Sequence, residues 1–294
     1  MALQTTGITL PREVVTETIN KAKGVSTIAQ LSPSTPQLFT DTTHLVFNPT
    51  SEAEVVAEGA SKSSYEQTLT PVEGKRVKLV TTTRVTNELQ WADEDAKTEI
   101  VQHIIDDQAE ALGRAIDYVI YHAINPKTGA TLSGYTSLIS EAVAVTSGAK
   151  EYENIDAMAD ALIDYEINGL ALSREFASAL RKVRVEATGQ RLYPEIPLSL
   201  EPTTVDGIKT VTSNTVNGAL VTPATGVRAI MGDFSVIKWG MVRDMHSELI
   251  EYGDPDGAGT DLKNVNQVAY RTESMFAYAV LDAKAFAYLK KASA

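Results

Sequence analysis

The residues best suited to chemistry lie in one acidic stretch near the C-terminus, residues 254–261, with the sequence DPDGAGTD. Carboxylates at alternate positions beside glycine are typical of loops that bind Ca²⁺ through oxygen ligands. Two positions break the pattern, because Ala258 stands where a fifth-position ligand is required and Val265 replaces the bidentate glutamate. We therefore predict a turn rich in glycine and aspartate that holds no metal. A cytosolic metal-dependent enzyme that uses this loop is a lower-ranked alternative.

Other catalytic patterns are missing from the sequence. It contains no phosphate-binding loop, no nucleophile elbow and no His-Glu-x-x-His motif. It also has no cysteine, which excludes disulfides, thiolate metal sites and thiol nucleophiles, as expected for a reducing cytosol. The histidines stand singly and, with both tryptophans, are expected at the surface or in the core: His44, His103, His122, His246, Trp91 and Trp239. The sequence predicts a protein that is not an enzyme and needs no cofactor.

Composition and charge indicate a folded chain that does not grip nucleic acid. The 294 residues are 43% hydrophobic and 22% charged, which suits one large core or two smaller ones. The formal net charge is −12, from 26 basic and 38 acidic residues, whereas a nucleic-acid groove needs clustered Lys and Arg. An acidic wall is screened beyond about 8–10 Å, so the charge suits a container. An ordinary acidic cytosolic protein explains it equally well. We expect no membrane span and no signal peptide.

The order of the elements is more informative than any single motif. Residues 1–41 read as a loose polar arm, and a β-hairpin follows over residues 42–82, with arms at 43–47 and 75–81 and a tip near 57–64. A two-stranded hairpin is marginal in water by itself, and the neighbouring sequence offers no hydrophobic partner. We therefore predict that a neighbouring subunit covers it.

A long amphipathic helix follows the hairpin. Apolar residues recur every three to four positions over residues 100–123, Asp93 or Asp95 can cap the start, and Asn125 with Pro126 ends the helix. About thirty residues make a helix of roughly 45 Å, with a core face and an acidic face. Helices are then expected at 154–168 and 173–186, and strands at 170–172, 208–211, 228–231, 236–239, 248–252, 265–271 and 275–281, leading into 285–289. Without regular alternation of strand and helix, the fold class is α+β.

Short stretches along the chain occur in a characteristic order. They are EVVAEGASK at 54–62, VTNEL at 85–89, LSREF at 172–176, MGDFS at 231–235, Arg271, and DAKAF at 282–286. Each stretch is weak alone, and their order is the informative feature. Over roughly residues 42–290 the chain resembles the major capsid proteins of tailed bacteriophages with the Hong Kong 97-type fold.

The resemblance implies a division of the chain and a function. The parts are an N-terminal arm (1–41), an extended loop (42–82), a peripheral domain with a spine helix (83–135), an axial domain (136–230), and a last segment (231–294) that returns strands to the peripheral domain and ends in the axial domain. The function implied is assembly of hexamers and pentamers into an icosahedral shell around double-stranded DNA, which is held without sequence specificity. Portal, scaffolding and decoration proteins are implied partners. The implied location is the virion, after assembly in the bacterial cytoplasm.

Two features bear on how far the resemblance extends. Because only some forty residues precede the hairpin, any scaffolding protein is expected to be a separate chain. Encapsulin shells use the same fold to enclose cargo protein and are the main alternative. The arm, rich in Ser, Thr and Pro, reads as extended where an encapsulin would have a cargo-facing helix, and this favours the phage.

The resemblance also implies candidate site residues. Glu58, Gly59 and Lys62 lie at the tip of the extended loop, where they are expected to contact another subunit. In the self-crosslinking member of the family, a loop-tip Lys attacks the side-chain amide of an Asn in another subunit, and a Glu seven residues after that Asn takes up protons. The similar positions here are Lys62, Asn266 and Glu273.

Overall fold

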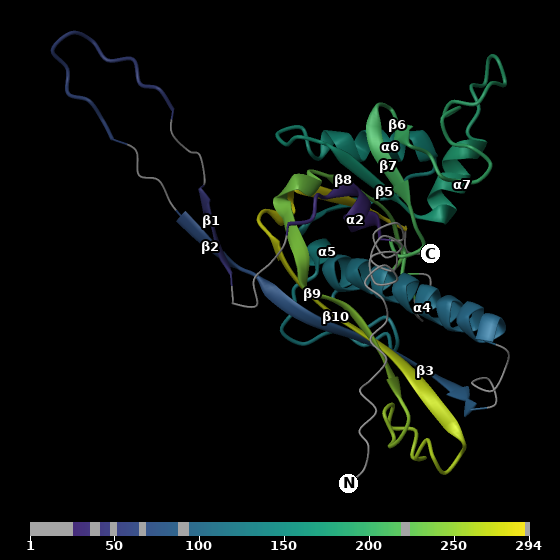
Figure 1. The fold of residues 1–294 in the computed structure, drawn as a ribbon. Helices are drawn as coiled ribbons and strands as arrows, with labels where there is room; N and C mark the ends of the chain where they lie inside the picture. The colour runs from purple at the N-terminus through teal and green to yellow at the C-terminus, as the bar shows by residue number, and fades with distance from the viewer. Residues whose placement is uncertain are drawn as a thin grey trace.

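The computed structural model describes residues 26–35, 42–47, 52–64, 69–87, 94–218 and 224–291. They form a mixed α+β fold, as predicted, with strands in three sheets: β1-β2, β3-β10-β9 and β4-β11-β8-β5-β7-β6. The β1-β2 ribbon and its tip project away from the other two sheets (Figure 1). Two hydrophobic cores lie on opposite faces of the six-stranded sheet, and one of them also fills the space beneath the three-stranded sheet.

The projecting ribbon is shorter than the predicted hairpin. Strand β1 (Thr43–Phe47) pairs in antiparallel register with β2 (Leu69–Glu73), so the prediction that residues 75–81 form the returning arm was wrong. At Gly74 the chain leaves the ribbon, and its N–H donates to the Thr42 carbonyl at 2.7 Å. Strand β3 (Lys75–Thr86) instead pairs with β10. The β-branched composition of β3 suits either partner, but Val77 and Leu79 are buried in the core, which favours the larger sheet.

The three-stranded sheet is built from long strands. Strand β9 (Ile237–Ile250) and β10 (Gln267–Val280) are continuous over 14 residues each, where the sequence predicted two pairs of short strands. Polar residues suggested breaks, but one face of this sheet is solvated and accepts them at alternate positions. Two register shifts, on either side of Met275, interrupt the pairing of β10 with β9 without ending either strand.

The predicted long helix is present, and it packs along this sheet. Helix α4 (Glu94–Asp117) continues into a π-helix, η1 (Tyr118–His122), and ends at Ala123 in the left-handed conformation with φ 50°. Its apolar stripe is buried, including Ile105 and Leu112, whereas Asp107 and Glu110 are exposed. The proposed cap Asp93 lies outside the described residues.

The six-stranded sheet is completed by the end of the chain. Its strands are β4 (Val143–Thr146), β5 (Gly169–Leu172), β6 (Thr204–Val205), β7 (Ile208–Thr212), β8 (Val227–Gly232) and β11 (Phe286–Lys290). Strand β11 lies between β4 and β8, so residues after β10 return to this sheet. Short elements connect the layers: α5 (Leu138–Glu141), η2 (Phe234–Val236) and η3 (Ala283–Ala285).

Two helices cover one face of the six-stranded sheet (Figure 1). Helix α6 (Glu151–Asp160) begins and ends earlier than the predicted 154–168, and α7 (Arg174–Lys182) ends before the predicted residue 186. The predicted cap of α7 is confirmed, because the Ser173 hydroxyl accepts from the Phe176 N–H at 3.2 Å. Helix α7 ends where exposed polar residues begin, whereas after α6 the buried Leu162 continues the core in a turn.

The segment before the ribbon is anchored in the core. Residues 27–31 form helix α2 (Thr27–Leu31), and Ser26, Thr27 and Ile28 are fully buried. The prediction of a loose arm was therefore wrong for this segment, because its hydroxyls bind a partner about ninety residues away in sequence. Residues 1–25 of the predicted arm lie outside the described residues.

Candidate functional site

The tip of the projecting loop holds its own shape. The Glu54 carboxylate accepts from the Ser63 hydroxyl at 2.6 Å and from the Ser63 N–H at 3.2 Å, which joins the two sides of the loop and lowers the pKa of Glu54. Gly59 supplies the positive φ of the turn, at 79°. Glu58 and Lys62 are exposed, as expected for loop-tip residues, and the Val55 side chain is fully exposed.

The ribbon below the tip also exposes apolar side chains. Leu45 and Phe47 are 62% and 63% exposed and face Pro71 and Leu69 across the ribbon, so these four residues share one face. Contiguous exposed apolar surface of this kind marks an interaction site in a soluble chain. The sequence-based prediction that the hairpin lacks a core of its own is therefore supported for the β1-β2 ribbon.

A groove lies where the ribbon joins the body. It has a volume of about 620 Å³ and is lined by residues from the ribbon base, the start of β3, β10 and the loop after η1. Val77, Tyr135 and Met275 supply apolar surface, and the Tyr135 hydroxyl donates to the Arg76 carbonyl at 2.8 Å. Lys75, Arg76 and Lys78 supply three cationic side chains. No local pattern predicts this groove, because residues that line it, such as Val77 and Met275, lie about 200 positions apart in the sequence.

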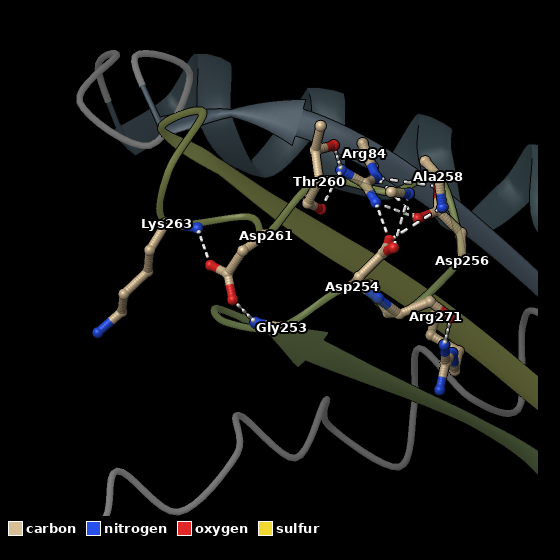
Figure 2. Close-up of polar contacts among 11 residues, drawn as sticks. Arg84, Gly253, Asp254, Asp256, Ala258, Thr260, Asp261, Lys263 and Arg271 are labelled. Carbon is tan, nitrogen blue, oxygen red and sulfur yellow. Dashed lines mark hydrogen bonds and ion pairs between the residues drawn. The ribbon is translucent and has the colours of Figure 1, made fainter.

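The acidic turn at 254–261 is closed around an arginine, not a metal. Arg84 of β3 donates to both Asp256 oxygens at 2.9 Å, to Asp254 at 2.6 Å, and to the Thr260 hydroxyl and carbonyl at 3.0 and 3.2 Å (Figure 2). Hydrogen bonds from this guanidinium lower the pKa of Asp256 to about 2. The Ala258 and Gly259 N–H groups donate to Asp254, at 3.0 and 2.7 Å.

Five oxygen atoms thus surround the guanidinium of Arg84. Ca²⁺ and Mg²⁺ also prefer oxygen ligands, but here the guanidinium occupies that position. Within the described ranges, no group of three or more His, Cys, Asp or Glu residues could hold a metal ion. Arg271 also donates to the Pro255 carbonyl on the other side of the turn (Figure 2). The turn is a fixed structural element of the three-stranded sheet.

The three candidate crosslinking residues do not meet within one chain. Asn266 has a positive φ of 55°, and its side-chain oxygen accepts from the Asn87 side-chain amide at 3.0 Å. Glu273 accepts from Lys78 at 3.0 Å on the face of the sheet beside the groove. Seven residues of extended strand span about 23 Å, so Asn266 and Glu273 of the same chain lie far apart.

A buried carboxylate that the sequence did not single out anchors the segment before the ribbon. Asp117, at the end of α4, accepts from the Thr27 and Ile28 N–H groups at 2.9 and 3.2 Å. It also accepts from the hydroxyls of Ser26, Thr27 and Thr215, at 2.5, 2.8 and 2.6 Å. Burial raises the pKa of Asp117, and these hydrogen bonds oppose the rise.

The isolated aromatic residues occupy structural positions. His122 is buried, its Nε2 lies 3.1 Å from the Thr215 carbonyl, and burial lowers its pKa to about 4. Trp239 is buried in the core and its indole N–H donates to the Ser32 carbonyl at 3.3 Å, in line with the predicted packing role. Trp91 lies outside the described residues.

The chain matches one protein family over nearly its whole length. The model of the phage capsid family matches residues 6–291. Among solved structures, a chain from Mycobacterium phage Ogopogo is 34% identical, with a TM-score of 0.82 over 91% of this chain and 92% of that one. A chain from Gordonia phage Cozz is 28% identical, with a TM-score of 0.75 over 92% and 87%.

A more distant structure shares the fold. The capsid of a native GTA particle, computed with C5 symmetry, is 16% identical with a TM-score of 0.62 over 93% of this chain and 91% of that one. No curated protein sequence matches the chain. In the part of the chain that the structure describes, no helix is long and apolar enough to cross a membrane.

Proposed function

The chain belongs to the phage capsid family, and from this premise we propose that its projecting loop lies over a neighbouring copy and holds the shell together. Its function is structural: it is a major capsid subunit of the virion and not an enzyme. The observation that carries the proposal is the exposed apolar face of the ribbon, with Phe47 63% exposed. Burial of such side chains between copies contributes about 1.5–3 kcal/mol for each large residue.

The proposed division of the subunit follows the Hong Kong 97-type plan. The extended loop comprises the β1-β2 ribbon and its tip, and its predicted end at residue 82 is moved back to Gly74, where β3 begins. The peripheral domain comprises α4 as the spine helix with β3, β9 and β10. The axial domain comprises the six-stranded sheet with α6 and α7, closed by β11. The hydrophobic core between the six-stranded sheet and helices α6 and α7 supports the axial domain as a unit, whereas the other core joins this sheet to the peripheral domain.

The proposed assembly is a closed shell of hexamers and pentamers. It encloses double-stranded DNA without sequence-specific contacts, consistent with the net charge of −12. Portal, separate scaffolding and decoration proteins are proposed partners, and assembly is proposed to occur in the bacterial cytoplasm. The family match favours this function over an encapsulin-type compartment or a metal-dependent enzyme.

A covalent Lys62–Asn266 bond between subunits is a separate proposal, and the distance between Asn266 and Glu273 limits which subunits can supply them. In this reaction the Lys62 amine replaces the amide nitrogen of Asn266, and ammonia leaves. Because about 23 Å of strand separates Asn266 from Glu273, a Glu273 that serves as the base must come from a different subunit than Asn266. Glu273 must also give up its ion pair with Lys78 before it can accept a proton from Lys62. Ladders on denaturing gels of mature shells that vanish in Lys62→Ala would support the bond, and a single band near 32 kDa would refute it.

Deletion of the loop tests the main proposal. Replacing residues 44–72 by a short Asn-Gly turn removes both the tip and the apolar face of the ribbon, and the new turn joins Thr43 to Glu73, which are paired in the native register. We expect a folded, soluble subunit with an unchanged circular dichroism spectrum that no longer forms shells in light scattering and electron micrographs. Normal shells from the deleted chain would contradict the proposal, and so would an unfolded subunit, because the loop would then stabilise its own chain.

A further inference from the structure

The loop tip and the groove at the ribbon base have complementary surfaces. Residues 52–64 contain three carboxylates, Glu52, Glu54 and Glu58, and one cation, Lys62. In their midst the Val55 side chain is fully exposed. The Glu54 contact with Ser63 joins the two sides of the tip before any partner binds, which reduces the entropy lost on docking.

The groove offers the matching chemistry. Its volume of about 620 Å³ lies within the range of roughly 300–1,000 Å³ in which protein pockets hold compact ligands. Its apolar surface comes from Val77, Tyr135 and Met275, which suits a small aliphatic side chain. Around this surface stand the cationic side chains of Lys75 and Lys78, which are 46% and 54% exposed.

Both lysines have intrachain partners, but each side chain stays about half exposed at the groove. The Lys75 ammonium lies 4.0 Å from Glu73, whose side chain is 78% exposed, so water screens this pair. Lys78 contacts Glu273 at 3.0 Å but remains about half exposed. Each ammonium can therefore contact a second carboxylate while it keeps its intrachain partner.

Tip and groove lie at opposite ends of one ribbon. The groove is lined by Thr42, Glu73 and Gly74 at the base of the ribbon, whereas the tip lies beyond its far end (Figure 1). A contact between two different patches of identical subunits is heterologous, and it repeats around a ring when the rotation closes. The length of the ribbon would then set the spacing between neighbouring copies.

We infer that the loop tip of one copy docks in the ribbon-base groove of the next, with Val55 on the apolar floor and Glu52 and Glu58 against Lys75 and Lys78. The inference rests on the proposed function, in which the loop lies over a neighbouring copy, and it names the surface that receives the loop. It makes assembly sensitive to salt, because exposed charge pairs are screened.

Engineered disulfides test the contact directly, because the chain has no cysteine of its own. The variant carrying Val55→Cys and Met275→Cys should form disulfide-linked multimers in mild oxidant, visible as a ladder on a non-reducing gel. The matched control pairs Val55→Cys with Ile163→Cys, a residue that is 83% exposed but distant from the groove. A ladder no stronger than that of the control would overturn the docking.

Charge reversal provides a second readout that separates docking from folding. Lys75→Glu with Lys78→Glu should raise the subunit concentration for half-maximal assembly about tenfold, as expected when two attractive pairs become repulsive. Glu52→Lys with Glu58→Lys should do the same, and the fourfold variant should recover assembly. Misfolding caused by the groove changes would not be rescued by changes at the tip.

Different results would refute the docking of the tip in the groove and the proposed function of the loop. If neither charge reversal affects assembly while deletion of the loop abolishes shells, the loop acts between copies but docks elsewhere, and this inference is refuted. If loop deletion also leaves shells intact, the proposed function of the loop is refuted with it. Loss of assembly in both double variants without recovery in the fourfold variant would refute the specific pairing.

Discussion

Removal of the Asp117 carboxylate should release the segment before the ribbon from the core. In Asp117→Ala, the N–H groups of Thr27 and Ile28 lose their acceptor in a fully buried environment. Each unsatisfied N–H costs about 1–3 kcal/mol. The Thr27 and Thr215 hydroxyls keep second partners, Tyr121 and Ser213, so their loss is smaller.

Removing the buried charge of Asp117 also stabilises the folded subunit, and this gain offsets part of the lost hydrogen bonding. The variant no longer buries a charge, and that desolvation is what raises the pKa of Asp117 in the folded protein. We therefore expect a net loss of about 3 kcal/mol in the free energy of unfolding of the unassembled subunit, or roughly 6 °C in Tm. The exposed Asp107→Ala on the same helix is the control and should change stability by less than about 0.5 kcal/mol.

Hydrogen exchange assigns the loss to its cause. Urea unfolding gives the free energy, and exchange at the Thr27 and Ile28 amides should become faster in Asp117→Ala than in Asp107→Ala. A variant within about 1 kcal/mol of the parent, with both amides still protected, would refute the argument. In that case the segment would be held by its apolar contacts and not by Asp117.

Two further perturbations follow from the described contacts. Because burial lowers the pKa of His122 from 6.5 to about 4, the unfolded chain takes up the proton first, and stability falls as pH drops through this window. The loss in the free energy of unfolding reaches about 2 kcal/mol at pH 5. Urea unfolding at pH 7.5 and pH 5 should show this loss reduced in His122→Gln and unchanged in the exposed His246→Gln. An equal loss in the parent and both variants would contradict the assignment to His122. Arg84→Met should return the pKa of Asp256 from about 2 toward its ordinary value and speed amide exchange in the turn at 253–261. An NMR titration with an unshifted Asp256 would show that the guanidinium does not control this turn.

The sequence predicted correctly those elements whose stabilising contacts lie within a few residues of one another. The long helix could be predicted because its apolar stripe repeats along one stretch of chain, and the cap at Ser173 because its partner is three residues away. The turn at 254–261 was predicted to hold no metal, but Arg84, which fills it, lies about 170 residues earlier in the sequence and gave no signal.

The sequence-based predictions were wrong where a segment can adopt more than one structure and its contacts with residues far away in the sequence determine which one forms. Strand β3 was assigned to the hairpin because its composition fits any sheet, and its true partner β10 begins about 180 residues later. The Ser, Thr and Pro content of residues 1–41 favoured an extended arm, yet the hydroxyls of Ser26 and Thr27 donate to Asp117 in the core. The groove at the ribbon base combines residues from three distant stretches, so only the folded structure reveals it.

Electron cryomicroscopy of particles assembled from the purified chain tests the central claim most directly. We predict closed shells in which the β1-β2 ribbon of each subunit lies over the adjacent copy, with density for Val55 in the groove beside Tyr135 and Met275. A loop folded back onto its own subunit, or a chain that stays dispersed under assembly conditions, would contradict the claim that this loop joins neighbouring copies.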